Sequence, residues 1–408
     1  MNESDAASSE GAASDRALGR IFRAESARIV AALTGSLGNL DLAEEAMADA
    51  VAEALVQWRR DGVPPNPGGW LTTAARHNAL DRLRREKRYR QKLEVLAEER
   101  PSTRSDIDER LPLLFGCCHP ALTPSAQLAL TLRAVCGLTT EQIARATFST
   151  SVATGQRIVR AKRKIGAAGI PLRVPTGADR APRLDLVLIV ISVMYNEAHL
   201  VAGGDARADR DLADDALWLA DVVAGALPDE AEAQGLVALL AFHRSREAAR
   251  SLGGELVLLA DQQRDRWDGR LQAHARRALK RAAALRRPGK WQLQAAIAAC
   301  HADAPSIEDT DWRQIVILYD MLLAFDPSPV VHLNRAVALA EIGRVQTALA
   351  VVDEMEGVLN GYHLWHGVRA HLLRRLGREA EAAAADERAG MLTANEAERR
   401  LLASRRQP

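Results

Sequence analysis

The sequence is poor in aromatic residues, cysteine and long apolar runs, and each shortage excludes a class of protein. Aromatic residues make up only 4% of the chain while alanine, leucine and arginine dominate, a composition that suits packed helices and leaves little for a sheet core. The longest apolar run, Leu186 to Tyr195, is about half of the roughly 20 residues that a bilayer span requires, so we expect no membrane association. Four cysteines, two of them adjacent, indicate reduced thiols and a cytoplasmic protein.

The sequence also lacks a signal-peptide core and a substantial net charge. The first residues, MNESDAASSEGAAS, are acidic, small and polar, and they predict a frayed tail over residues 1–15 and no secretion. The formal net charge is +1, so a strongly basic stretch is a local asymmetry. Such an asymmetry is typical of a surface that meets nucleic acid or an acidic partner.

Helical periodicity and proline-rich breaks predict an all-α protein of three domains. At 408 residues the chain is long enough for several hydrophobic cores. We expect a tail over 1–15, a first domain over 16–92, a charged linker over 93–110, a helix-turn-helix domain over 111–170, a proline-rich linker over 171–183 and a long helical domain over 184–404.

The first domain combines an acidic helix, a stiff loop and a basic helix. Asp41 is a plausible N-cap of the acidic helix, and the loop from Arg59 to Gly69 is rich in proline and glycine. A second helix starts at Trp70 and ends in a dense run of basic residues up to Lys92. Such a helix end suits phosphates, although a basic run alone is more often a solvated surface.

The second domain has the pattern of a helix-turn-helix. Thr123 caps a helix that has Pro124 in its first turn and stops at Gly137. A short helix opened by Thr139 or Thr140 follows, and then a basic helix begins near Val152. No Asp or Glu occurs between positions 142 and 178, so this third helix indicates duplex DNA as the partner.

The C-terminal block contains a repeat of 34 positions. The period relates Gly343 to Gly377 and Arg344 to Arg378, and it relates two pairs of alanines, Ala336 with Ala370 and Ala348 with Ala382. Glycine at an inter-helix turn with small residues where helices approach is typical of tetratricopeptide repeats. The pattern is imperfect, since Met355 stands where a second small residue is usual.

Several motifs of the chain, taken in order, resemble those of a known family. Residues 16–170, with "LDLAEEAMADA", "GVPPNPGGWL", "ARHNALDRLRREKR" and "LALTLRAVCGLTTEQIARA" in this order, resemble a sigma factor of bacterial RNA polymerase of the extracytoplasmic-function type. The remainder, including "FGCCHPALTP", "YNEAH" and "DQQRDRW", is similar to the subgroup with a tetratricopeptide-like C-terminal extension. The resemblance implies a transcription initiation factor that binds core polymerase and promoter DNA.

The resemblance also assigns candidate residues. In the family the acidic helix docks on core polymerase, which here implies Glu45 and Asp49. The following loop and basic helix read the −10 element, and the positions implied are Asn66, Trp70, Arg76, His77, Asn78, Arg82, Arg84, Arg85 and Arg88. His77 stands where the family usually has Asn. The recognition helix implies −35 contacts at Ser151, Ala153, Thr154, Arg157, Arg160 and Lys164.

Other chemistry is weakly indicated. "CCH", from Cys117 to His119, is a poor tetrahedral chelate, so we expect no metal and no other cofactor. No nucleophile elbow or phosphate loop occurs, and we expect no enzyme. "DQQRDRWDGR", which contains Arg264 and Trp267, either lines a groove that takes a protein partner or signal on the solenoid, or forms buried ion pairs.

Two alternatives remain open at this stage. One is a helix-turn-helix regulator that binds operators through a repeat-type sensor domain, but it fails to explain the acidic helix, loop and basic helix of the first domain. The other is a solenoid scaffold whose basic helices are incidental, which salt-dependent promoter binding would argue against.

Overall fold

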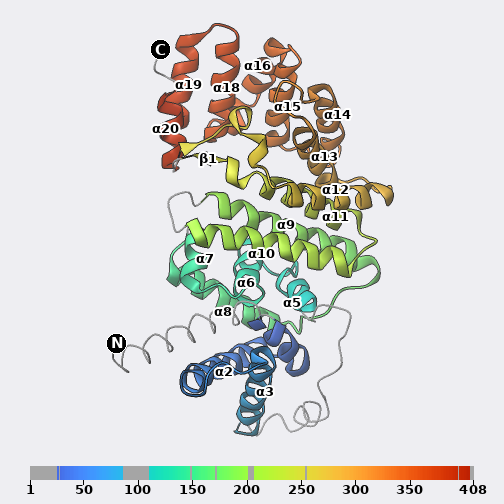
Figure 1. Cartoon of the computed structure of the whole chain (residues 1–408), viewed down its shortest axis with the longest axis vertical. Coiled ribbons are helices and arrows are strands. Elements are labelled where there is room, and N and C mark those ends of the chain that lie inside the picture. Colours follow the sequence, from blue (N-terminus) through green and yellow to red (C-terminus); the bar gives the residue numbers. More distant parts are fainter. Residues whose placement is uncertain are drawn as a thin grey trace. The chain divides into compact units, whose positions relative to one another are not determined.

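The computed structural model describes residues 25–26, 28–85, 110–147, 149–170, 172–200, 206–252, 255–393 and 395–404, and it confirms the all-α expectation (Figure 1). Within these residues the only strands are two short ones, β1 (Ser251–Leu252) and β2 (Glu255–Leu256), which pair antiparallel. The expected tail over 1–15 lies outside the described residues. So does the expected linker over 93–110, except for its last residue.

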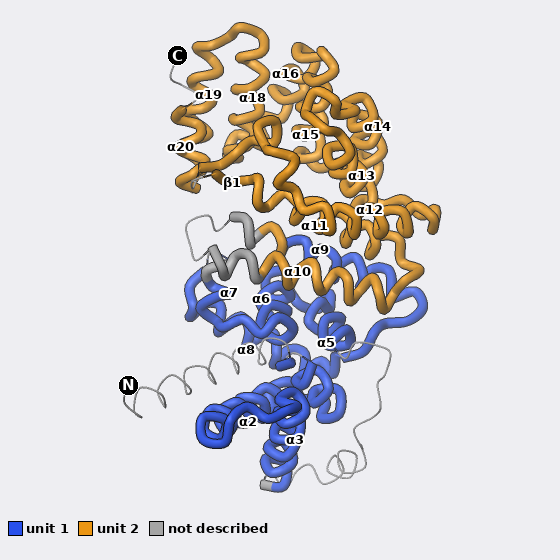
Figure 2. The backbone as a smooth tube through the Cα atoms, viewed as in Figure 1, with its two compact units in different colours: residues 1–194 blue, residues 195–408 orange. Residues whose placement is uncertain are grey.

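The chain divides into two compact units, residues 1–194 and 195–408 (Figure 2). The division falls inside α9 (Arg180–Leu200), a helix that starts before the expected boundary at residue 184. Arg183 of α9 donates to the carbonyl oxygen of Phe115 in α5, so the start of this helix is anchored within the first unit. The two units are described separately below.

In the first unit a helical pair precedes the helix-turn-helix. Residues 28–37 are helical and lead into α2 (Leu40–Asp61) and α3 (Pro67–Arg85). The prediction that Asp41 caps α2 is wrong, because the side chain of Asn39 accepts from the amide of Leu42. The sequence predicts that the second helix starts at Trp70, but α3 starts three residues earlier, at Pro67. Proline fits the first turn of a helix, because an N–H at that position has no partner within the helix.

The rest of the first unit forms four short helices. They are α5 (Arg110–Cys117), α6 (Pro124–Ala134), α7 (Thr140–Ala146) and α8 (Ser151–Ala167), followed by the 3₁₀ turn η2 (Gly177–Asp179). Local signals explain their starts. Thr139 and Gln142 exchange hydrogen bonds in a capping box at α7, and the hydroxyl of Thr150 accepts from the amide of Ala153 at α8. The turn after α6 needs glycine, because Gly137 has a φ of 72°.

The second unit begins with helices packed at very short range. They are α10 (Ala206–Ala226), α11 (Ala231–Ser245), α12 (Gly269–Ala284), α13 (Lys290–Asp303) and α14 (Trp312–Leu322), with the 3₁₀ turns η3 (Glu247–Ala249), η4 (Leu259–Asp261) and η5 (Arg264–Arg266) between α11 and α12. A Cβ on Gly235 would lie 2.6 Å from the amide nitrogen of Gln292 in α13. The carboxylate of Glu232 accepts from the amides of Trp291 and Gln292 and so caps α13.

Two helical hairpins with matching turns follow, at the spacing of the sequence repeat. They are formed by α15 (Pro329–Glu341) with α16 (Val345–Glu354) and by α18 (His363–Arg375) with α19 (Glu379–Leu392), while α17 (Glu356–Leu359) and α20 (Glu396–Ser404) complete the chain. At each turn the glycine has a positive φ, 84° at Gly343 and 72° at Gly377. The next residue donates to the carbonyl five positions earlier, Arg344 to Leu339 and Arg378 to Leu373. The four repeated alanines are completely buried.

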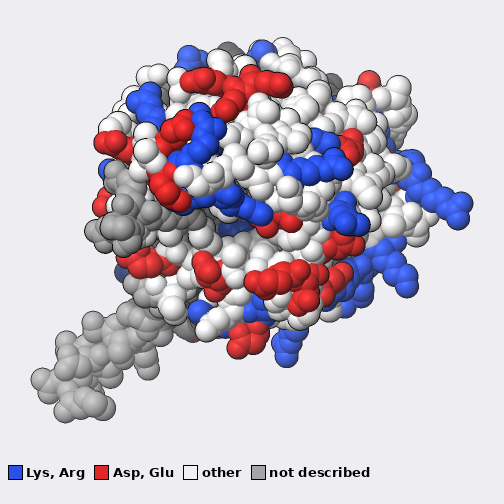
Figure 3. Space-filling view, turned by 90° about the horizontal axis from the view of Figure 1, so that it is seen from above, with Lys and Arg blue, Asp and Glu red and all other residues white. Residues whose placement is uncertain are grey.

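Charges of both signs cover the helices. Figure 3 shows lysine and arginine side chains interspersed with aspartate and glutamate over one face of the molecule, without a broad field of a single sign. This agrees with the formal net charge of +1. On this face, recognition of a charged partner would rest on a local arrangement of a few side chains.

The glycine turns of the repeat can be tested by a pair of substitutions. Gly377→Ala places a Cβ at positive φ and should destabilise the chain by about 1–2 kcal/mol. Gly367→Ala, inside α18 with no atom within 4 Å of the new Cβ, should stabilise it by about 1 kcal/mol, because alanine is the better helix former. Urea unfolding of the full chain measures both. Equal effects of the two substitutions would contradict the assignment of Gly377 to a required left-handed turn.

Candidate nucleic-acid interface

The start of α3 uses two of the predicted −10 residues for its own structure. The side chain of Asn66 accepts from the amide of Gly69 at 2.9 Å and so caps the helix. Trp70 is half-buried, and its ring lies 5.5 Å from that of Trp58 in an edge-to-face contact. Trp58 is 2% exposed, so this aromatic pair anchors the loop between α2 and α3. It holds the loop's backbone in a fixed position beside the exposed face of α3.

The predicted polymerase-binding acids lie against a predicted DNA-binding residue. Arg82 of α3 donates to Asp49 at 2.7 Å and also pairs with Glu45, both on α2. The three side chains are each between 33% and 58% exposed, so solvent screens these ion pairs and each adds little stability. The structure thus brings Glu45, Asp49 and Arg82 together on one exposed surface of the α2–α3 pair.

The remaining −10 candidates have different surroundings. Arg76 and Asn78 are half-buried whereas His77 is exposed, and Nδ2 of Asn78 is buried without an acceptor. Arg84 pairs with Asp81 one turn earlier, at 3.1 Å. The side chain of Arg85 and the whole of Arg88 lie outside the described residues. Of the described candidates on α3, His77 and Arg84 are therefore the most open to solvent.

The recognition helix α8 buries one stripe and exposes another. Thr154, Ile158, Ala161 and Ile165 form the buried stripe at the spacing of one helix face. The prediction of a DNA contact at Thr154 is therefore wrong for this conformation, since its side chain is completely buried. Ser151, Arg160 and Lys164 are exposed, and Ala153 and Arg157 are half-buried. These five positions remain as the candidate DNA-reading face.

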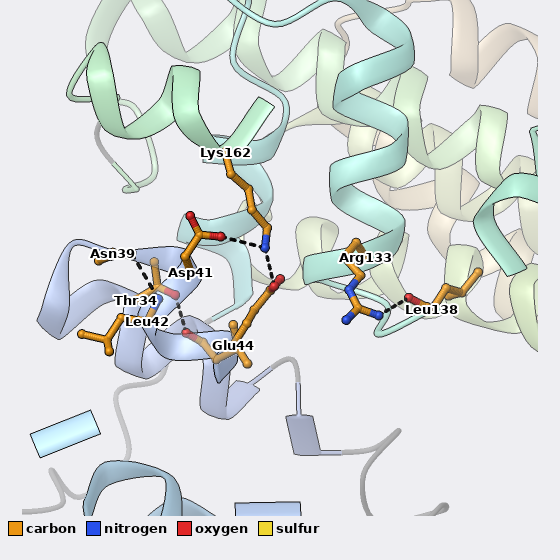
Figure 4. Close-up of polar contacts among 9 residues, drawn as sticks. Thr34, Asn39, Asp41, Leu42, Glu44, Arg133, Leu138 and Lys162 are labelled. Atoms are coloured by element: carbon orange, nitrogen blue, oxygen red, sulfur yellow. Dashed lines mark hydrogen bonds and ion pairs between the residues drawn. The ribbon is translucent and has the colours of Figure 1, made fainter. Parts of the chain in front are cut away.

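A lysine of α8 contacts the acidic helix α2. Nζ of Lys162 lies 3.0 Å from Oδ1 of Asp41 and 2.5 Å from Oε2 of Glu44 (Figure 4). The Lys162 side chain is 12% exposed and that of Glu44 19%. Burial acts to lower the pKa of Lys162, but the charge of Glu44 and hydrogen bonds to Glu44 and Asp41 outweigh it, and the pKa is raised. We refer to Lys162, Asp41 and Glu44 as the interdomain ion pair.

Sequence reasoning missed the interdomain ion pair. Lys162 is one of several basic residues in its helix, and Glu44 is one of several acids in α2, so nothing in either helix distinguishes them. Lys162 and Glu44 are 118 positions apart in the sequence, so no local sequence pattern predicts their contact. A pocket of about 530 Å³ lies beside it, lined by residues that include Thr34, Asp41, Lys162 and Arg163. Arg133 nearby is held by the carbonyl oxygen of Leu138 (Figure 4).

The adjacent cysteines face the core. Cys117 and Cys118 are completely buried, and burial is the main cause that raises the pKa of both thiols, to about 12 for Cys118. Both are therefore protonated at neutral pH, which is the form that packs as a small apolar group. In the described part of the chain, no three His, Cys, Asp or Glu side chains gather as a metal ion would require. Among the same residues, no helix is long and apolar enough to cross a bilayer.

Comparisons with known proteins match two parts of the chain and most of its length. Residues 21–89, which contain α2 and α3, match the family model described as sigma-70 region 2. Residues 183–283, from α9 through α12, match a family of unknown function, DUF6596. An uncharacterized protein of Rhizobium meliloti (strain 1021) is 42% identical over 372 residues, which cover 88% of each chain. No solved structure matches the chain.

The interdomain ion pair yields a prediction by charge reversal. Lys162→Glu places a third carboxylate beside Asp41 and Glu44 and should destabilise the contact between α8 and α2 by about 2 kcal/mol, between the values for exposed and fully buried pairs. Combining it with Glu44→Lys should recover most of the loss. Hydrogen–deuterium exchange of α2 and α8 in the full chain measures the opening.

Lys164→Glu is the matched control, because Lys164 is exposed on the same helix and makes no ion pair among the described residues. It should leave exchange in α2 unchanged. Faster exchange of α2 in the control, or no recovery in the double variant, would show that the effect comes from helix charge in general.

Proposed function

The chain belongs to the sigma-70 family, in one group with the Rhizobium meliloti protein, and we propose that it is a sigma factor of the extracytoplasmic-function type. It binds core RNA polymerase and directs transcription initiation in the cytoplasm. It contributes binding energy that favours the melted promoter and performs no covalent chemistry of its own. The observation that carries the proposal is the region 2 match over residues 21–89, where α2 and α3 present the acidic and basic surfaces that this role needs.

In this proposal the two domains of the first unit bind different elements of the promoter. The α2–α3 pair reads the −10 element, with its basic residues at the melted strand. The helix-turn-helix of α7 and α8 reads the −35 element through Arg157 and Arg160, whose guanidinium groups can reach guanine edges or phosphates. Support comes from the exposed face of α8, which carries Arg160 and Lys164 and has no acidic residue in its sequence.

The interdomain ion pair must open for this role. The two promoter elements are separated by roughly 25 base pairs, and at about 3.4 Å per base pair they lie on the order of 80 Å apart. Helices α2 and α8 are instead joined directly through Lys162. The described arrangement therefore suits the free protein, and binding to polymerase and promoter has to replace this contact with interactions of greater total strength.

The C-terminal unit supplies regulation in the same proposal. Its paired hairpins, α15–α16 and α18–α19, have the repeat period and the glycine turns of tetratricopeptide repeats. Solenoids of this kind commonly offer a binding surface to a protein partner. We propose that the extension controls the promoter-binding unit in cis, in response to a partner or signal.

The test of this function is run-off transcription from the gene's own upstream region with purified core polymerase. The full chain is compared with a chain that ends after Leu200, which keeps α9 whole. A transcript that depends on added protein is expected, and the shorter chain's yield gives the sign of the regulation. Salt-sensitive DNA binding by the full chain without any transcript would refute the sigma role and favour an operator-binding regulator.

Charge reversal on α2 tests the docking surface. Glu45→Lys with Asp49→Lys should reduce binding to core polymerase by at least about tenfold, since reversing contact charges costs more than deleting them. Glu53→Lys, exposed on the same helix and without an ion pair among the described residues, should have little effect. Affinity for core polymerase by surface plasmon resonance measures all variants.

Arg82→Ala separates docking from folding, because it breaks the same two ion pairs and leaves both acids in place. It should retain binding to core polymerase. If it instead lost as much affinity as the double reversal, the two acids would act by supporting α3 and not by contacting the polymerase.

A further inference from the structure

Three arginine side chains gather in the C-terminal unit without an acidic partner. Arg246 follows α11, Arg250 follows η3 and Arg264 begins η5. All three are partly buried. Within the described residues none of the three side chains forms an ion pair, and the one hydrogen bond that a side chain of the three donates goes from Arg264 to the carbonyl oxygen of His301. We call Arg246, Arg250 and Arg264 the arginine cluster.

A buried indole holds two members of the arginine cluster in place. The guanidinium carbons of Arg246 and Arg264 lie 5.4 and 4.7 Å from the ring centre of Trp267, which is 6% exposed. Stacking on an aromatic ring fixes a guanidinium while leaving its edge free to donate. Burial and then the charges of Arg250 and Arg264 lower the pKa of Arg246 to about 10, which reflects how closely the three cations lie.

The donors of the arginine cluster lack acceptors. Nε of Arg246, Nε of Arg250 and Nη2 of Arg264 are buried and make no hydrogen bond. Nε1 of Trp267 and Nδ1 of His301, beside them, are also buried and make no hydrogen bond. Burial and the nearby arginines lower the pKa of His301 to about 4, so its imidazole is neutral at neutral pH. Buried donors are almost always satisfied in folded proteins, so this concentration indicates a missing acceptor.

Among the described residues, the other partly buried arginines of this unit are each paired with an acid, which sets the cluster apart. The partners are Asp214 for Arg244, Asp320 for Arg335, Asp353 for Arg369 and Asp386 for Arg374. The acids nearest to the cluster do not fill this role. Glu247 lies 3.9 Å from Arg244, and Glu308 is fully exposed and acts on Arg264 only through space.

We propose that the arginine cluster is a binding site for a small molecule with a doubly charged oxyanion, either a phosphate group or two carboxylates. Guanidinium groups bind such oxygens through two parallel hydrogen bonds. Three fixed cations exceed the charge of a single carboxylate and match a dianion better. Because each arginine is only partly buried, the ligand can reach the cluster from solvent. The site is independent of the sigma-factor proposal, since it needs neither polymerase nor DNA.

Isothermal titration of the full chain tests this site. Sodium phosphate and disodium succinate are titrated separately, with ionic strength held constant by sodium chloride. We expect a dissociation constant below about 1 mM for at least one of them. Binding of phosphate alone identifies a phosphate group as the ligand chemistry, and binding of succinate identifies a dicarboxylate. Heat no greater than that of matched sodium chloride in both titrations would overturn the proposal.

Two substitutions separate ligand binding from folding. Arg250→Gln should weaken binding at least about tenfold, as expected for loss of a charged hydrogen bond. Arg266→Gln is the control, because Arg266 is exposed near Arg264 and outside the cluster, and its affinity should match the parent's. Without added anion, the Arg250→Gln chain should unfold at or above the parent's midpoint, since an unpaired cation has been removed. A lower midpoint, or equal loss of affinity in both variants, would show a structural role.

Discussion

Close approach of helices across alanine and glycine is the constraint on which the rest of the structure depends. With aromatic residues at 4%, the cores cannot be filled by large rings, so backbones must come together to exclude water. Gly235 lies so near α13 that a methyl group there would reach within 2.6 Å of a backbone nitrogen. The completely buried alanines Ala336 and Ala370 do the same for the hairpins. Each helix is thus fixed in rotation by its neighbours, which settles the side chains that it presents outward.

Many charged side chains form ion pairs between neighbouring helices, and the basic side chains that lack an acidic partner mark the two proposed binding surfaces. Outside the arginine cluster, each partly buried arginine described in the C-terminal unit meets an acid on a neighbouring helix, as Arg335 meets Asp320. Lys162 and Glu44 form such an ion pair between α8 and α2, in two domains of the first unit. By contrast, Arg160 and Lys164 on α8 and the arginine cluster around Trp267 have no acidic partner among the described residues. Both places combine fixed positive charge with access from solvent.

Local chemistry determined what the sequence could predict. The capping residue Thr139 and the turn at Gly137 act within a few positions of the chain, so these two helix ends followed from the sequence. The errors arose where a choice depended on packing. Asn39 and Asp41 are both good caps, and only the path of the preceding helix selects Asn39. Thr154 faces inward because its stripe meets α6 and α7, and Lys162 finds Glu44 across 118 positions.

The repeat also limits how the C-terminal end of the chain can change in length. Each hairpin reverses direction through the same backbone bonds at Gly343 and Gly377, and the period between them is 34 positions. An insertion of one whole period would continue the stack with its small residues in register. A single residue inserted within one of these helices would rotate the residues after it by about 100° and would carry charged side chains onto the buried stripe. A complete hairpin is therefore the unit that this end of the protein can gain or lose while keeping its buried stripe in register.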